Sequence, residues 1–201
     1  FGPYEGTTLY EMQIRSNDPD DLITFKYYDF SEDMIYDIQE NYIFVIDDII
    51  GNANNPNELT LGAVQYSIVL DGINLVSFYA LPTDNSVGNI FEELENSNPA
   101  IMGEGIAASF NGTWLGSLTE IEPIDGYWVR IDGEADLIVD GIPTDPGTAY
   151  SSHSGSNLIS YPFSGSAPIW QTIPEDAQSS IDGIFGEGVA GLNNDGEWQG
   201  T

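Results

Sequence analysis

The chain has 201 residues, of which 33 are Asp or Glu and three are Lys or Arg, so its formal net charge at pH 7 is −30. This balance excludes binding to nucleic acid or to an anionic membrane through the chain's own cations, because every approaching phosphate meets a negative field. Hydrophobic residues make up 41% of the chain, which is enough for a folded core. No apolar run approaches the roughly 20 residues that span a bilayer.

The acid excess also indicates the surroundings of the protein. Uncompensated negative charges repel one another unless salt or divalent cations screen them. We therefore expect saline or calcium-containing surroundings and an extracellular or cell-surface location. The sequence has no Cys, which removes disulfides and thiolate metal sites, so redox chemistry does not identify the compartment.

The first third of the sequence is predicted to form antiparallel β-structure. Alternation of apolar and polar side chains predicts a strand over residues 7–15. Aromatic and β-branched runs predict further strands over residues 23–30, 34–38 and 42–47. Clusters of Asn, Asp, Gly, Ser and Pro predict a turn over 16–21 and a loop over 51–58.

An internal repeat is the most informative feature of the remaining sequence. The block GINLVSF at 72–78 matches GSNLISY at 155–161, and residues 102–117 match residues 185–201. All matched positions follow one register, apart from a single residue inserted in the second copy. Matches in one register over that length do not arise by chance, so the two regions are predicted to have related structures.

Local patterns predict helices between the matched blocks. Val87, Ile90, Phe91 and Leu94 follow helical spacing behind a polar start signal, which predicts a short helix over residues 86–96. In the second copy Pro174 falls at the position of Phe91, so the corresponding helix is expected to restart at PEDAQ.

Strands are predicted on either side of this helix. A strand is expected over residues 64–70, and GYWVRI and DLIVDG predict two more strands after Trp114. In GYWVRI, Tyr127, Val129 and Ile131 alternate with Trp128 and Arg130. Alternation with period two places the first set on one face of a sheet and the second set on the other.

These blocks resemble a known module. The pattern NL(I/V)S(F/Y), GEG(I/V)A, (T/E)W(L/Q)G(S/T) and DGYWVRIDG resembles a module repeated in large secreted and cell-surface proteins of marine bacteria, often exported by the type IX route. Residues 22–48 resemble the C-terminal half of a β-sandwich domain that commonly precedes it. The resemblance implies a linking, adhesive or structural part of a multidomain surface protein and supplies no catalytic residues.

The predicted fold is therefore mainly β, with a partial antiparallel β-sandwich followed by two related β-rich repeat units with short helices. The sandwich part is expected over residues 1–62. The first repeat unit, called the first segment below, covers residues 63–150. The second segment covers residues 151–201 and is expected to be incomplete at its C-terminus.

No set of residues is assigned to catalysis. The single histidine, His153, lies in a polar loop, and no nucleophile motif such as G-x-S-x-G accompanies it. Adjacent carboxylates arise from composition in a chain with 33 acids. We therefore predict a non-enzymatic structural or adhesive segment of a surface protein or filament. A carbohydrate-binding accessory module of a secreted multidomain protein is the alternative.

Calcium is the one cofactor that the sequence favours, because hard cations bind several Asp, Asn and carbonyl oxygens in flexible loops. Three loops qualify: Asn17, Asp18, Asp20 and Asp21; Asp47 and Asp48 with Asn52, Asn54 and Asn55; and Asn193, Asn194 and Asp195. None of them is a complete EF-hand loop. The alternative is a set of Asx turns, since the same residue types close turns without a metal.

Two kinds of partner are expected. Trp128, opposite the buried side of its strand, is the candidate for stacking on a polysaccharide. Packing in the core or between repeats is the favoured role of the aromatic residues, and Trp114 and Trp198 suit it because they recur at matched positions. Both ends of the chain are expected to expose sheet edges, which pair with other domains of the same polypeptide or with neighbouring subunits. Such pairing between subunits would give a filament.

Overall fold

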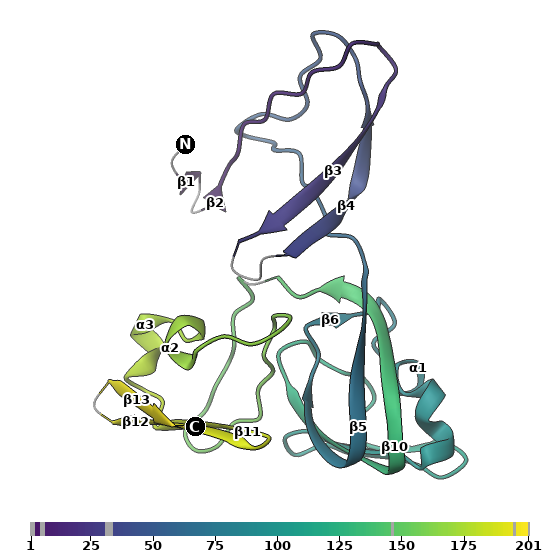
Figure 1. The fold of residues 1–201 in the computed structure, drawn as a ribbon, viewed down its shortest axis with the longest axis vertical. Helices are drawn as coiled ribbons and strands as arrows, with labels where there is room; N and C mark the ends of the chain where they lie inside the picture. The colour runs from purple at the N-terminus through teal and green to yellow at the C-terminus, as the bar shows by residue number, and fades with distance from the viewer. Residues whose placement is uncertain (1–2, 5–6, 31–33, 146, 195, 201) are drawn as a thin grey trace. The chain divides into compact units, whose positions relative to one another are not determined.

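The computed structural model describes residues 3–4, 7–30, 34–145, 147–194 and 196–200, with the backbone alone at positions 3, 4, 7, 8, 34 and 170. The chain forms two compact units, an N-terminal unit, Phe1–Gly62, and a C-terminal unit, Ala63–Thr201 (Figure 1). Both contain antiparallel sheets and few helical residues. The prediction of a mainly β protein is confirmed.

The N-terminal unit contains two small antiparallel ladders. Strand β1 (Pro3–Tyr4) pairs with β2 (Thr7–Thr8), and β3 (Leu22–Asp29) pairs with β4 (Met34–Ile43). The β3–β4 pair confirms the strands expected from the two aromatic runs. The register between them is irregular between Thr24 and Lys26, where the ladder is interrupted.

Two strand predictions in this unit are wrong. The expected strand over 7–15 reduces to β2, because no strand of the described chain pairs with residues 9–15, and Tyr10 is 91% exposed. The expected strand over 42–47 is not a separate strand, because β4 continues to Ile43 and ends there. The chain turns there, and Asp47 adopts a left-handed conformation with φ of 61° that a strand does not accommodate.

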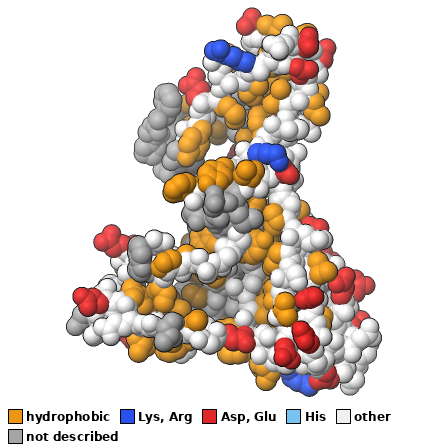
Figure 2. Space-filling view, in the orientation of Figure 1, with side chains coloured by type: hydrophobic (Ala, Val, Ile, Leu, Met, Phe, Trp, Pro, Cys, Tyr) orange, Lys and Arg blue, Asp and Glu red, His pale blue; other side chains and the backbone are white. Residues whose placement is uncertain are grey.

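The β3–β4 sheet covers little of its own apolar surface. Among the described hydrophobic residues of this unit, Tyr36 is the one that is buried, whereas Tyr27, Tyr28 and Ile35 are exposed. Figure 2 shows hydrophobic side chains at the molecular surface among the carboxylates. A two-stranded sheet has two faces and few neighbours, so it gains little stability from burial alone.

The main sheet of the C-terminal unit is built on two long strands. It has the order β5-β10-β7-β8-β9, and β6 pairs with the far end of β10. The bounds are β5 Val64–Ser77, β6 Ala80–Leu81, β7 Ala100–Met102, β8 Ala107–Phe110, β9 Trp114–Gly116 and β10 Gly126–Pro143.

Strand β10 replaces the two strands predicted from GYWVRI and DLIVDG, and β5 likewise runs through residues 64–70 and most of 72–78. The β5–β10 register shifts between Arg130 and Glu134, and Gly72 and Gly133 have positive φ in this region. An irregularity of this kind bends a strand without ending it. Local sequence patterns therefore detected both halves but not their continuity.

The helical region lies where the sequence predicts it. Helix α1 (Val87–Ile90) begins after Ser86, whose hydroxyl accepts a hydrogen bond from the Asn89 N–H at 3.3 Å. It is followed by the 3₁₀ helix η1 (Glu92–Ser97). The second segment contains α2 (Ile169–Thr172) and α3 (Glu175–Gln178), which restarts after Pro174 as predicted. Among the described residues, no helix is long and apolar enough to cross a membrane.

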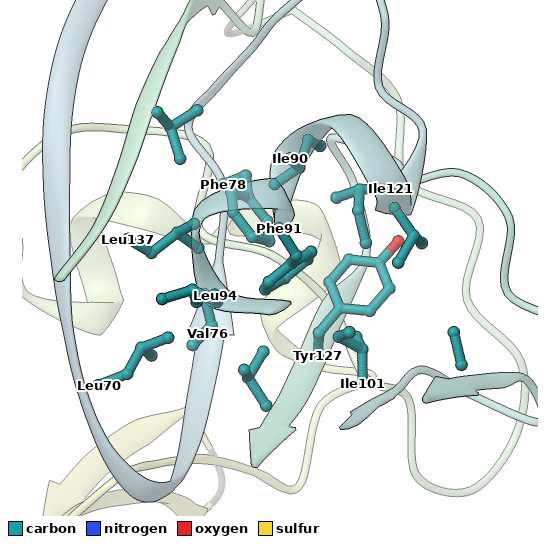
Figure 3. Packing of buried hydrophobic residues seen from close by; sticks show 14 of the residues in the cluster. Leu70, Val76, Phe78, Ile90, Phe91, Leu94, Ile101, Ile121, Tyr127 and Leu137 are labelled. Carbon is teal, nitrogen blue, oxygen red and sulfur yellow. The ribbon is translucent and has the colours of Figure 1, made fainter. Parts of the chain in front are cut away.

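One apolar core holds α1 and η1 against the inner face of the main sheet (Figure 3). All four predicted helix positions, Val87, Ile90, Phe91 and Leu94, are buried in it. From the sheet it receives the fully buried side chains Leu70, Ile101, Tyr127, Val129 and Leu137. The alternation predicted along β10 is confirmed, because Tyr127, Val129 and Ile131 point inward while Trp128 and Arg130 are exposed.

The second segment adds a three-stranded antiparallel sheet, β11 (Gly183–Gly186), β12 (Val189–Asn194) and β13 (Glu197–Gly200). Its first matched block, residues 155–161, contains no strand, although residues 72–78 lie largely in β5. Ile159 forms a single bridge with Asp125 instead. The backbone of this block pairs with the short stretch around the start of β10, through the Gly126 N–H and the Ile124 carbonyl, and not with a long strand of the described chain.

Candidate functional site

The β11–β12–β13 sheet has the same local geometry as β7–β8–β9. Strand β11 begins at the position that matches the first residue of β7, and β12 and β13 follow in the same register. The Phe110 N–H donates to the Pro99 carbonyl at 2.9 Å, and at the matched positions the Asn193 N–H donates to the Asp182 carbonyl at 2.9 Å. The two sheets thus use equivalent backbone hydrogen bonds.

The matched tryptophans occupy equivalent positions as well. The Trp114 indole N–H donates to Glu95 Oε1 at 3.1 Å, and the Trp198 indole N–H donates to Gln178 Oε1 at 3.2 Å. The two acceptors, Glu95 and Gln178, also occupy matched positions. Both residues offer a side-chain oxygen, but glutamate carries a negative charge and glutamine does not. The Trp114 ring also packs on Phe110, with 5.4 Å between ring centroids. Both residues therefore share the indole hydrogen bond, and ring packing is observed for Trp114.

Two matched glycines allow close backbone approach in these sheets. A Cβ atom on Gly116 would lie 2.1 Å from the Ala107 carbonyl oxygen, and one on Gly200 would lie 2.0 Å from the Ala190 carbonyl oxygen. Both distances are far inside van der Waals contact. Neither position has room for a side chain.

A reciprocal pair of glutamate contacts links the two segments. Glu104 Oε2 accepts a hydrogen bond from the Leu158 N–H at 3.1 Å, and Glu187 Oε2 accepts one from the Leu75 N–H at 2.9 Å. Each glutamate comes from the GEG turn of one segment, and each leucine comes from the NL block of the other. A carboxylate acceptor makes such bonds stronger than neutral ones.

His153 joins this contact through Glu104. Its Nε2 lies against Glu104 Oε1, and its Nδ1 lies 3.0 Å from the Ser154 carbonyl oxygen. Both partners accept hydrogen bonds, so the doubly protonated imidazolium fits best. The Ser154 carbonyl, followed by Glu104, raises the pKa of His153, and the hydrogen bond from His153 lowers the pKa of Glu104. Burial, followed by the charge of Glu104, raises the pKa of Asp125.

These shifts predict a pH window for the contact between His153 and Glu104. The pKa of His153 is raised from 6.5, so its contribution to stability is complete below that value and disappears as pH rises through the folded pKa. The pKa of Glu104 is lowered from 4.5, so its contribution is present above that value and disappears as pH falls through the folded pKa. The contact stabilises most between these two values.

Thermal melting of the wild type and a His153→Gln variant from pH 4 to pH 9 checks this prediction. The difference in Tm should be largest near pH 5.5 and should shrink toward alkaline pH. We expect a modest effect, because both side chains are about half exposed. A Tm difference that stays constant across the range would contradict the ion pair.

Trp128 lies on the outer face of the main sheet, where its 40% exposure agrees with the predicted orientation. It is directly opposite Met102 of β7 and Leu75 of β5. Met102 is also exposed, as is Leu115 on β9. The sheet therefore presents apolar side chains outward, with Met102 next to Trp128 and Leu115 three strands away. Sugar binding by Trp128 stays a prediction.

The first proposed calcium loop is held together by hydrogen bonds. The Asp21 side chain accepts a hydrogen bond from the Ser16 hydroxyl, and the Asp20 N–H donates one to the Phe44 carbonyl at 2.9 Å. Asn17 and Asp18 are exposed in the bend before them. The left-handed φ of 69° at Asp20 is one that Asp tolerates in turns.

The second loop contains similar turn contacts. Asp48 accepts from the Tyr42 hydroxyl at 2.9 Å, and Asn52 Oδ1 accepts from the Asn54 N–H at 2.9 Å. The latter bond defines an Asx turn. Asp47 lies exposed beside Asp48.

In the third loop, Asn193 has a structural role. Its side-chain amide donates to the Gln178 carbonyl at 2.7 Å, and its Oδ1 accepts from the Gly196 N–H at 2.8 Å. Asn194 is exposed at the end of β12, and Asp195 lies outside the described residues.

The turn alternative therefore accounts for much of the chemistry of these loops. Within residues 3–4, 7–30, 34–145, 147–194 and 196–200, no three His, Asp or Glu side chains are grouped to hold a metal ion. Calcium also binds backbone and Asn oxygens, so its sites do not require three such side chains. Calcium binding stays a prediction.

Comparison with known proteins adds no assignment. No protein-family model, curated protein or solved structure matches this chain. The resemblance to a module of marine bacterial surface proteins therefore stays a prediction, and function has to be argued from the chain's own contacts.

The reciprocal glutamate contact was not predicted from the sequence. A signal for it existed, because Glu104 and Glu187 lie in one recurring block and Leu75 and Leu158 in another. The sequence could not predict which residues the glutamates bind, because each leucine contributes its backbone N–H, which every residue except proline carries.

Proposed function

We propose that this chain is a non-enzymatic structural or adhesive segment of an extracellular surface protein or filament. In this proposal the first and second segments are two copies of one unit. The observation that carries it is the reciprocal contact of Glu104 with Leu158 and of Glu187 with Leu75. Reciprocity of this kind is the property of an isologous interface, in which the same patch is used twice.

The matched sheets support the same proposal. Equivalent hydrogen bonds, tryptophan contacts and crowded glycines recur at matched positions, which is expected of repeats whose neighbours stabilise each other. We further propose that the N-terminal unit is part of a β-sandwich. Its exposed side chains Tyr28 and Ile35 lie opposite each other on one face of the β3–β4 pair, which suits a sheet face that packs on a second sheet. The net charge of −30 suits saline surroundings.

A carbohydrate-binding accessory module is the second candidate function. It is favoured by Trp128, whose exposed ring lies on a sheet surface beside Met102. Rings in such positions can stack on the apolar face of a sugar. A neutral polysaccharide is the appropriate probe, because the chain's own charge repels anionic ones.

A titration with a neutral polysaccharide distinguishes the two functions. For a structural segment, we expect no saturable change in tryptophan fluorescence. Saturable quenching that Trp128→Ala abolishes and the matched outer-face variant Leu115→Ala retains would favour the carbohydrate-binding module. Both variants alter exposed positions, so the fold is expected to survive and circular dichroism can confirm this.

Calcium is proposed as a stabilising ligand of the acidic loops. A ligand that binds the native state alone raises stability by mass action. Adding a chelator at constant ionic strength is therefore expected to lower the Tm, and added calcium should restore it. Sodium at matched ionic strength is the control for screening. An unchanged melting curve in chelator would count against specific binding by Asp20, Asp48 and their neighbours.

A further inference from the structure

The two matched sheets differ at one edge. In the first segment, β7 is paired on both sides, with β8 and with β10. Val129 of β10 lies opposite Ile101, and both side chains are fully buried. In the second segment, β11 pairs with β12, and no other strand of the described chain borders it.

The backbone direction at this edge follows from the matched ladders. Asp182 accepts a hydrogen bond from Asn193 of β12, as Pro99 accepts one from Phe110 of β8. Because hydrogen-bonding directions alternate along an antiparallel strand, the next residue, Gly183, and then Phe185 direct their N–H and C=O groups to the outer edge. The equivalent residues of β7 direct theirs to β10.

Ile184 of β11 also lacks the cover that its counterpart has. It is only partly buried, whereas its counterpart Ile101 is fully buried. Phe185 is 68% exposed and its counterpart Met102 is 49% exposed, so this position lies on an outer face in both sheets. The strand sequence GIFG contains no Lys or Pro, two residues that protect edge strands from pairing. Asp182 and Glu187 flank it with negative charge, which favours a cation on an incoming strand.

We propose that the free edge of β11 binds an extended polypeptide segment as an added antiparallel strand. This proposal rests on the repeat relationship proposed above, which identifies the occupant as a strand of the type found at residues 126–131. In the register of β10 on β7, a valine would face Ile184 and a tryptophan would face Phe185. An arginine would face Gly183. A second folded copy is not the occupant, because its own β10 is already paired between β5 and β7.

The probe is a synthetic peptide, EPIDGYWVRIDG, that copies residues 122–133. Mixed with the whole chain, it is expected to bind saturably with one peptide per chain, measured by calorimetry. Binding should slow hydrogen exchange of the Gly183 and Phe185 amides in the chain. A peptide of the same composition with its alternation scrambled is expected to show no saturable binding.

Two N-methylated peptides test the backbone geometry without altering the protein. Positions 128 and 130 face β7 in the native sheet, whereas positions 127 and 129 face β5, because Leu75 directs its N–H away from β10 toward Glu187. Methylation at 128 and 130 should therefore weaken binding by about thirtyfold through loss of two backbone hydrogen bonds. Methylation at 127 and 129 should have little effect.

The outcomes separate this inference from the proposal it rests on. Two outcomes would overturn the strand-addition proposal alone. One is equal binding of both methylated peptides, and the other is no peptide binding while the Asn193 amide remains protected from exchange. An unprotected Asn193 amide would contradict the matched sheets themselves. Slow exchange of Gly183 and Phe185 in a dimer without peptide would show that a second copy occupies the edge, which also overturns the proposed occupant.

Discussion

Replacing Phe91 by Ala is expected to lower the free energy of unfolding of the C-terminal unit by about 3–5 kcal/mol. The Phe91 ring is fully buried where α1 meets η1, and it packs edge-on against Phe78 with 6.2 Å between ring centroids. It also lies 6.2 Å from the Trp114 ring. Alanine would leave a cavity at the point where the helix and the sheet meet.

Urea unfolding, followed by circular dichroism, measures this change. The matched control is Phe185→Ala, which removes the same ring from an exposed position and is expected to cost about 0.5 kcal/mol or less. Similar losses for both variants would contradict the core described above. If Phe91→Ala changed only the slope of the unfolding free energy against urea concentration, and not the midpoint, the change would lie in the denatured state instead.

Adding one methyl group at Gly116 or at Gly200 is expected to destabilise the protein by about 3 kcal/mol in each case. The new Cβ atom would overlap the carbonyl oxygen of Ala107 in the first variant and of Ala190 in the second. Backbone atoms cannot move aside as a flexible side chain can, so a strand pair has to separate. The overlap is shared by the two sheets, whereas Gly116 adds backbone strain, because its φ of 144° favours glycine and Gly200 has no positive φ.

Gly105→Ala is the control for this pair, because Gly105 has a left-handed φ of 74° but nothing within 4 Å of an added Cβ. It should cost only the backbone strain, about 1–2 kcal/mol. Thermal melting of the three variants gives the comparison. A Gly200→Ala variant as stable as the wild type, beside a destabilised Gly116→Ala, would argue against two copies of one unit.

Several elements were predictable because neighbouring residues alone determine them. The period of two along Tyr127, Val129 and Ile131 describes a strand with one buried face, and the structure contains that strand with that face inward. The helical spacing of Val87, Ile90 and Leu94 works in the same way. In both cases a local period aligns side chains that a core can then cover.

The same kind of pattern failed where a neighbour was required. Residues 9–15 alternate as a strand does, yet no described strand pairs with them, and a strand without a partner leaves its backbone hydrogen bonds unmade. Strand β10 shows the opposite case, because its partner β5 carries it past the bend near Gly133 as one element. Pairing partners, and not local periodicity, decide where strands end.

By itself, the sequence determined the β class, the inward and outward faces of β10, the helix positions and the register of the matched blocks. Tertiary structure alone decided that Glu104 binds Leu158, that Glu187 binds Leu75, and that the edge of β11 has no neighbour in the described chain. The reason is physical. Faces and helices depend on residues a few positions apart, whereas these contacts join backbone groups and carboxylates that are far apart in sequence and meet only when the chain has folded.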